Sequence, residues 1–284
     1  MRTTRPTHGV VSLPVLDVRP EPAHAAELLS QLLLGETVTL LSRSRDGGWL
    51  RVRNEADGYA GWVRAWGVVE ASGARVARWR RLAGGRIGVP MAVVRAGRGT
   101  GASVSPVFFG GRLIAARAVR GWCAVELPDG RRGQLPASAL ARGRKPTIEE
   151  RVASLLGSPY LWGGRSPAGY DCSAFVQQVL LEQGISLPRD ARDQCRGSRP
   201  VAGKERVGDL AFFRRAGEPA SHVGIALGGG YFAHCRGRVV VASLENDNPL
   251  YDKDLRPQFM GWYHPVTQLI TNRSAVGQLP ARRA

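Results

Sequence analysis

The chain has 284 residues, of which 43% are hydrophobic and 7% aromatic, and its formal net charge is +17. Such a composition supports ordinary buried cores in two or three domains and excludes a disordered chain. No apolar run approaches the roughly 20 residues that a membrane-spanning helix needs, so we expect no membrane span.

The positive charge comes almost entirely from arginine. Lysine occurs only at Lys145, Lys204 and Lys253, which leaves 37 of the 40 basic residues as arginine. These arginines are scattered, as codon bias in a GC-rich genome would produce, whereas a nucleic-acid interface gathers its charge on one face. We therefore expect no nucleic-acid partner, and the charge favours anionic small substrates or wall polymers.

The amino-terminal stretch and the cysteines bear on the compartment. The stretch "MRTTRPTHGVVSLPVLDVRPEP" lacks the apolar region and cleavage site of a secretory signal, which predicts a cytoplasmic protein; export by an unrecognised route is the alternative. The cysteines form no CxxC pair and no disulfide framework, as in a reducing compartment. They are Cys123, Cys172, Cys195 and Cys235.

The first half of the chain reads as two small β domains. Alternating runs such as "ETVTLLSR", "WLRVRN" and "AGWVRAW" are separated by glycine-rich turns. The run from Pro22 to Gly35 has helical periodicity, but its β surroundings favour a long loop. We predict β-barrels over 10–72 and 76–142, followed by the linker "ARGRKP" at 141–146.

The pattern changes at Thr147. The segment "TIEERVASLLG" carries a threonine cap, acidic residues in its first turn and a glycine stop, which predicts a helix. A second helix is predicted from Cys172 to Gly184, and strand-like runs follow to residue 268. Helices followed by a meander of strands predict an α+β domain over 147–268.

The position of Cys172 suggests chemistry. A thiol at a helix amino terminus lies at the positive end of the helix dipole, which is expected to lower its pKa and supply thiolate near neutral pH. The free amides there can also hold an oxyanion when a carbonyl is attacked. A nucleophile of this kind needs a histidine as base and a third group that orients the histidine.

Two of the five histidines fit that need. His222 and His234 stand in strand-like runs on either side of the "LGGG" turn, so a hairpin would make them close neighbours. One of them could then orient the other against the helix that begins at Cys172. The remaining histidines, in loop or proline-adjacent contexts, are His8, His24 and His264.

At these residues the chain resembles a family. "PYLWGGRSPAGYDCSAFV" followed by "SHVGIALGGGYFAH" is similar to the NlpC-type cell-wall cysteine peptidases over 147–268. The runs "AELLSQLLLGETV" and "GYAGWV" look like bacterial SH3 domains. The resemblance implies an α+β papain-like catalytic domain preceded by two small all-β SH3-like barrels. The chain departs from many relatives at Ala191, where they have Ser or Thr, and in "GWYHP", which replaces a more usual arginine ending.

The resemblance also implies catalytic roles. Cys172 would be the nucleophile, His222 the general base and then acid, and His234 the residue that orients His222. Tyr160 matches the family tyrosine whose hydroxyl assists the oxyanion, although it could also be an ordinary core residue. Cys235 follows His234 directly, and strand alternation points it to the other face, so we expect a packing role.

Substrate-binding residues are implied in the same way. Asp171 matches an acid that receives the free amino group of the substrate, and it could also cap the helix. Ser173 matches a residue that contacts a substrate carboxylate. Relatives of this architecture add an acid and a tyrosine from the first SH3-like domain, for which the candidates here are Glu27 and Tyr59.

The implied activity is hydrolysis of the amide bond between γ-linked D-glutamate and a diamino acid in peptidoglycan stem peptides. Released muropeptides with a free amino-terminal L-alanine are the expected substrates, as in cell-wall recycling. No metal or cofactor is expected, because no His, Cys and carboxylate set has zinc spacing. The alternatives are a secreted hydrolase of intact wall, an acyltransferase on the same core, and a non-catalytic module that binds wall or nucleic acid.

Overall fold

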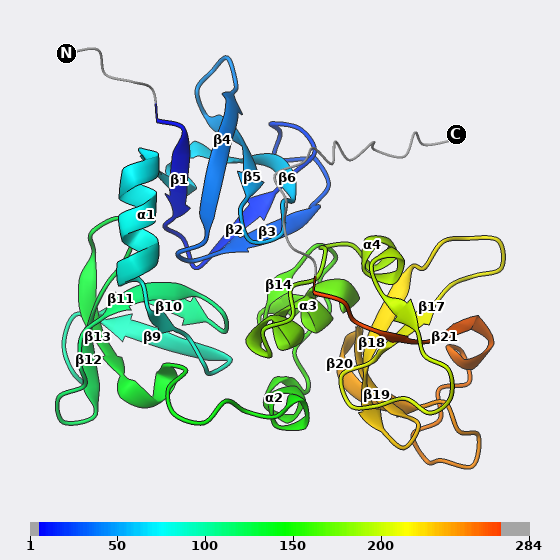
Figure 1. Ribbon diagram of the computed structural model, residues 1–284. Coiled ribbons are helices and arrows are strands. Elements are labelled where there is room, and N and C mark those ends of the chain that lie inside the picture. Colours follow the sequence, from blue (N-terminus) through cyan, green and yellow to red (C-terminus); the bar gives the residue numbers. More distant parts are fainter. Residues whose placement is uncertain (1–5, 268–284) are drawn as a thin grey trace.

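A computed structural model describes residues 6–267, in which two β units precede an α+β unit (Figure 1). Over this range no helix is both long enough and apolar enough to cross a bilayer. The described range contains the predicted domain 147–268 except for residue 268, which lies outside it.

The first unit is an antiparallel sheet in the order β6-β5-β4-β1-β7, with the hairpin β2–β3 beside β6. The run from Pro22 to Gly35 contains no helix, and its end forms β3, whose Leu32 and Leu33 are buried. Burial of these side chains in a β core overrides their helical spacing. The elements are β1 (His8–Val11), β2 (Val15–Val18), β3 (Ser30–Leu33), β4 (Thr37–Arg43), β5 (Trp49–Asn54), β6 (Ala60–Arg64), η1 (Ala65–Gly67) and β7 (Val68–Ala71).

Helix α1 (Gly73–Leu82) was not expected from the sequence. Ser72 caps it by accepting a hydrogen bond from Arg75 N, and Val76 is buried against Val10 of the first unit. Trp79 Nε1 donates to the carbonyl of Gly35 at 3.0 Å. The predicted start of the second β domain at residue 76 is therefore wrong, because that position lies inside a helix packed on the first unit.

The second unit starts at β8 and is one antiparallel sheet in the order β10-β9-β13-β12-β11-β8. Its core alternates along the strands and includes Val94, Val107, Leu113 and Val125. The elements are β8 (Gly85–Arg86), β9 (Met91–Arg95), β10 (Ser103–Phe108), β11 (Arg112–Ala115), β12 (Trp122–Glu126), β13 (Arg132–Pro136) and η2 (Ala137–Ala139).

The third unit has the predicted order of helices followed by strands. Its six-stranded sheet runs β16-β21-β17-β18-β19-β20. The helices are α2 (Ile148–Leu155), α3 (Cys172–Glu182) and α4 (Ala191–Arg196), with η3 (Arg256–Gln258). The strands are β14 (Arg165–Ser166), β15 (Gly169–Tyr170), β16 (Arg199–Pro200), β17 (Leu210–Phe213), β18 (His222–Gly228), β19 (Tyr231–Arg236), β20 (Arg238–Ser243) and β21 (Phe259–His264).

Helix α3 is the centre of the molecule and lies between the first β unit and the sheet (Figure 1). It is buried from Cys172 to Leu180, and Phe175 and Val179 share one core with Val223 and Ile225 of β18. A helix that is buried on all its faces needs cover on every side, and the β units provide part of it. Phe109 of the second unit joins this core.

Buried arginines of the third unit bind the first unit. Arg165 is 1% exposed, and its guanidinium donates to both carboxylate oxygens of Glu36, at 3.0 and 3.1 Å, and to the carbonyl of Gln31 at 2.7 Å. Arg189 Nε donates to Ser30 Oγ at 2.9 Å. Because a buried guanidinium without its partner is strongly unfavourable, these contacts hold β3 and its neighbours in one place against α3.

Candidate active site

Cys172 is the first residue of α3, and Asp171 is its cap. The Asp171 side chain accepts from Ala174 N at 2.8 Å, so the helix begins where the sequence predicted. Cys172 is 8% exposed, and it shares a core with Val223 of β18. The nucleophile candidate therefore packs against the residue that follows His222.

The resting thiol differs from the expectation. Burial raises the pKa of Cys172 to about 12, and the Asp171 carboxylate adds to the rise. The neighbouring amides and Arg189 lower the pKa, but they do not compensate for the lost hydration of a thiolate. The predicted lowering of this pKa by the helix dipole is therefore wrong, because burial is the larger effect, and the free protein carries a protonated thiol.

The two histidines form a hydrogen-bonded pair. β18 and β19 turn through Gly228, Gly229 and Gly230, which all have positive φ, as an "LGGG" hairpin requires. His222 Nε2 and His234 Nδ1 are 2.9 Å apart, and the rings stand at 88° to each other. The predicted proximity of the two side chains is confirmed.

Both imidazoles are neutral at neutral pH. Burial, and next the neighbouring His234, lower the pKa of His222 to about 3. Burial lowers the pKa of His234 to about 4, against the attraction of Asp252. A neutral His222 keeps one ring nitrogen free to accept a proton, which is what a general base requires.

Tyr160 stands at the mouth of the site. Its backbone amide donates to the carbonyl of Gly237 at 2.8 Å, and its side chain is 37% exposed rather than part of a core. Burial of the ring, and next Cys172, raise the pKa of Tyr160 to about 12. The phenol is thus protonated at neutral pH and can donate a hydrogen bond.

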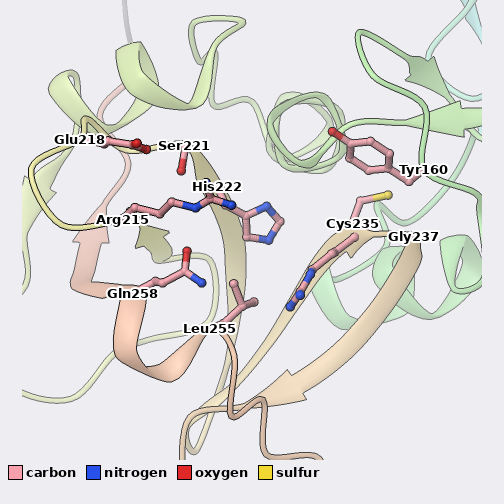
Figure 2. A pocket seen from close by; sticks show the side chains of 10 residues that line it. Tyr160, Arg215, Glu218, Ser221, His222, Cys235, Gly237, Leu255 and Gln258 are labelled. Atoms are coloured by element: carbon pink, nitrogen blue, oxygen red, sulfur yellow. The ribbon is translucent and has the colours of Figure 1, made fainter.

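A pocket of about 460 Å³ opens beside Tyr160 and His222 (Figure 2). Cys235 forms part of its wall, and the sulfur lies 3.3 Å from the carbonyl of Tyr170. Burial, and next Cys172, raise the pKa of Cys235 to about 12. Cys235 packs in the core of α3 whereas His234 packs on Phe232 of the opposite face, as strand alternation predicted.

Asp171 is engaged by more than the helix. Arg189 donates to both of its oxygens, at 3.1 and 2.5 Å, and Gly163 N donates to Oδ2 at 3.1 Å. Ser173 Oγ donates to Oδ1 at 3.1 Å and accepts from Arg189 at 2.9 Å. Asp171 and Ser173 therefore belong to one buried network, and Oδ2 is the oxygen with the fewer donors.

Arg189 was not identified from the sequence. It is 2% exposed and its partners come from α3 and from β3 of the first unit. The only local signal is its place in "LPRD", in the loop that follows the end of α3 at Glu182. Because the sequence contains 37 arginines, the burial of Arg189 could not be recognised before its partners were known.

The two candidates from the first β unit are placed differently. Tyr59 is partly buried, and burial, and next the Asp190 carboxylate, raise the pKa of its phenol. Glu27 is exposed, and across residues 6–267 its side chain makes no hydrogen bond or ion pair. Its neighbour Leu28 lies against Gly163, which donates to Asp171.

The other histidines lie elsewhere in the fold. His8 opens β1, and His264 ends β21 directly before Pro265; each residue pairs with a neighbouring strand. His264 Nδ1 lies 2.9 Å from Asp209 Oδ1. His24 stands in a turn and stacks on Trp49.

Residues 157–256 match the NlpC/P60 family, and residues 18–66 match the bacterial dipeptidyl-peptidase SH3 domain. The gamma-D-glutamyl-L-lysine dipeptidyl-peptidase of Bacillus subtilis is 37% identical over 118 residues, which are 40% of this chain and 40% of that protein. Dipeptidyl-peptidase 6 of Lysinibacillus sphaericus is 32% identical over 149 residues, which are 47% of this chain and 53% of that protein. The chain thus covers about half or less of these relatives.

The fold has a counterpart along nearly the whole chain. The crystal structure of an NlpC/P60 family protein from Bacillus cereus superimposes with a TM-score of 0.78 at 20% identity, covering 92% of this chain and all of that one. An NlpC/P60 endopeptidase from Photobacterium damselae gives a TM-score of 0.66 at 15% identity, covering 84% of this chain and 66% of that one. The predicted papain-like domain and first SH3-like domain are confirmed.

Proposed function

We propose that this chain, in which an NlpC/P60 domain follows a bacterial SH3 domain, is a cysteine peptidase of peptidoglycan stem peptides. It cleaves the amide bond between γ-linked D-glutamate and a diamino acid. The observation that carries the proposal is the thiol of Cys172 at the start of α3, in one core with Val223, together with the hydrogen-bonded pair that His222, the residue before Val223, forms with His234. The name of the Bacillus subtilis relative supports the bond.

The neutral thiol and neutral imidazole define the first step. The Cys172 proton passes to His222 Nδ1 as the sulfur attacks the carbonyl carbon, so charge develops only in the transition state. The carbonyl oxygen becomes an oxyanion, which the Tyr160 hydroxyl and the backbone amide of Cys172 stabilise. Preorganised donors of this kind are usually the largest single contribution to acyl transfer.

Three proton transfers complete the cycle. The imidazolium of His222 protonates the amine of the diamino acid, the carbon–nitrogen bond breaks, and an acyl thioester remains on Cys172. A water then gives its proton to His222 and attacks the thioester, which releases the dipeptide and returns the proton to sulfur. His222 Nε2 and His234 Nδ1 share a hydrogen bond, and in the tautomer that the mechanism requires His222 donates in it, which leaves His222 Nδ1 free to take the thiol proton.

The first β unit forms the acyl side of the site. Tyr59 and Asp171 Oδ2, with Glu27 as the outer acid, receive the ammonium of an amino-terminal L-alanine. Ser173 and Arg189 receive the α-carboxylate of the D-glutamate. A stem still attached to muramic acid has no such ammonium, so the preference is for released peptides.

The finer assignments follow from this preference. An enzyme that hydrolyses released peptides would act in cell-wall recycling. We therefore propose that it is located in the cytoplasm. The second β unit, with its six antiparallel strands and its own core, is proposed to be a second SH3-like barrel that supports α2 and α3.

The test is mass spectrometry of L-Ala-γ-D-Glu-diamino acid tripeptides and their N-acetyl forms after incubation with the full chain. We expect the free diamino acid and L-Ala-D-Glu, and at least about 100-fold slower turnover of the N-acetyl forms, because two charge-assisted contacts are lost. Cys172→Ala should be inactive and the matched Cys235→Ala active. Absence of the expected products, or equal rates for the free and acetylated peptides, contradicts the proposal.

A further inference from the structure

The pocket beside His222 is distinct from the Asp171 network. Its wall contains Tyr160 and His222 but none of Asp171, Ser173 or Tyr59. The proposed function puts the scissile bond at Cys172 and His222, with one of these two regions for each side of the bond. If the acyl group occupies the Asp171 side, as the proposed function states, the pocket receives the leaving diamino acid.

One loop brings two opposite charges to this pocket. Arg215 and Glu218 lie between β17 and β18, and a turn closed by Glu218 N and the carbonyl of Arg215, at 3.0 Å, places them together. Figure 2 shows the Arg215 side chain directed toward His222, with Glu218 on the same loop. Within residues 6–267 neither side chain has a hydrogen bond or an ion pair, with each other or with another residue.

The second arginine of the pocket, Arg236, already has ion-pair partners. Arg236 lies 3.4 Å from Asp254 and 3.7 Å from Asp252, so two carboxylates already balance its charge. Arg215 is therefore the guanidinium that is available to a ligand, and Glu218 is the available carboxylate. Together they match a ligand group that carries a carboxylate and an ammonium side by side.

From this pairing we infer that Arg215, with Glu218, selects a diamino acid whose side chain ends in a carboxylate beside an amino group, as in diaminopimelate, over lysine. This inference rests on the proposed function and specifies its leaving group. Glu218 can bind the side-chain ammonium of either diamino acid. Arg215 finds a carboxylate only in the first and repels the ammonium of lysine, so the preference comes from Arg215.

A simpler role for Arg215 would be to bind the main-chain carboxylate that both diamino acids share. The two roles predict different effects of an Arg215 substitution on the ratio of kcat/KM for the two substrates. Loss of a main-chain contact lowers turnover of both substrates equally, whereas loss of a side-chain contact lowers turnover of the carboxylated substrate alone.

The experiment compares kcat/KM for L-Ala-γ-D-Glu-meso-diaminopimelate and L-Ala-γ-D-Glu-L-lysine with the full chain. A charge-assisted contact in a water-exposed pocket predicts a preference for the first substrate of about 10-fold or more. Arg215→Gln should reduce the ratio to about one and Arg215→Glu should favour lysine. Glu218→Gln should lower kcat/KM for both substrates. Arg214→Gln is the matched control, since Arg214 is the chain neighbour of Arg215 and does not line the pocket.

The outcomes separate this inference from the proposed function. A wild-type enzyme that cleaves neither peptide overturns both. Cleavage of both peptides with a wild-type ratio near one, or a ratio that Arg215→Gln and Arg215→Glu leave unchanged, overturns the inference alone. An equal fall for both substrates in Arg215→Gln assigns Arg215 to the main-chain carboxylate and also overturns it.

Discussion

The buried ion pair between Arg165 and Glu36 predicts a large loss of stability when one partner is neutralised. The Arg165 side chain is 2% exposed and that of Glu36 is 11% exposed. Glu36→Gln keeps the shape but leaves a buried guanidinium without a countercharge, and such losses cost about 3–5 kcal/mol. Glu36 also accepts from Leu33 N at 3.0 Å, which ties the pair to β3.

The measurement is urea unfolding of the full chain at neutral pH, with Glu126→Gln as control. Glu126 pairs with Arg132 on the surface, where the side chains are 37% and 78% exposed, so its loss should cost well under about 1 kcal/mol. Because the first β unit carries Tyr59, KM of the remaining folded enzyme should also rise. Equal costs for Glu36→Gln and Glu126→Gln would refute the reasoning that this pair holds the units together.

Three further predictions concern the reacting groups. Tyr160→Phe should lower kcat by about 10- to 1000-fold with little change in KM, as loss of an oxyanion donor does, and an effect on KM alone would recast Tyr160 as a binding residue. His234→Phe should lower kcat at least about 10-fold at unchanged KM, because His222 loses the hydrogen bond that fixes its tautomer; unchanged kcat would contradict this. Unfolding free energy should fall as pH drops from about 6.5 to about 4, since the pKa values of His222 and His234 are lowered to about 3 and 4 and only the unfolded chain binds protons there. The same loss of stability in His234→Phe would argue against that origin.

The catalytic groups could be predicted because their signals are local. Cys172 follows a capping aspartate at the start of an apolar helix, and His222 and His234 flank a three-glycine turn. Each signal lies within about a dozen residues, and the hairpin geometry then determines which side chains meet.

Other features depend on distant contacts. Arg165 and Arg189 bind residues that lie 129 to 159 positions earlier in the chain, and nothing near them marks burial. Helix α1 has few apolar residues, and its buried face is apparent only from the contact between Val76 and Val10 of β1. The pKa of Cys172 was predicted in the wrong direction because the helix terminus is visible in the sequence, whereas its burial is not.

The most direct test of the central claim is to trap the acyl group on the enzyme. The full chain is mixed with L-Ala-γ-D-Glu-diaminopimelate, quenched with acid during the first turnover and digested for mass spectrometry. We expect a single thioester adduct of L-Ala-γ-D-Glu on Cys172. An adduct on Cys235 instead, or continued turnover by Cys172→Ala, would contradict it.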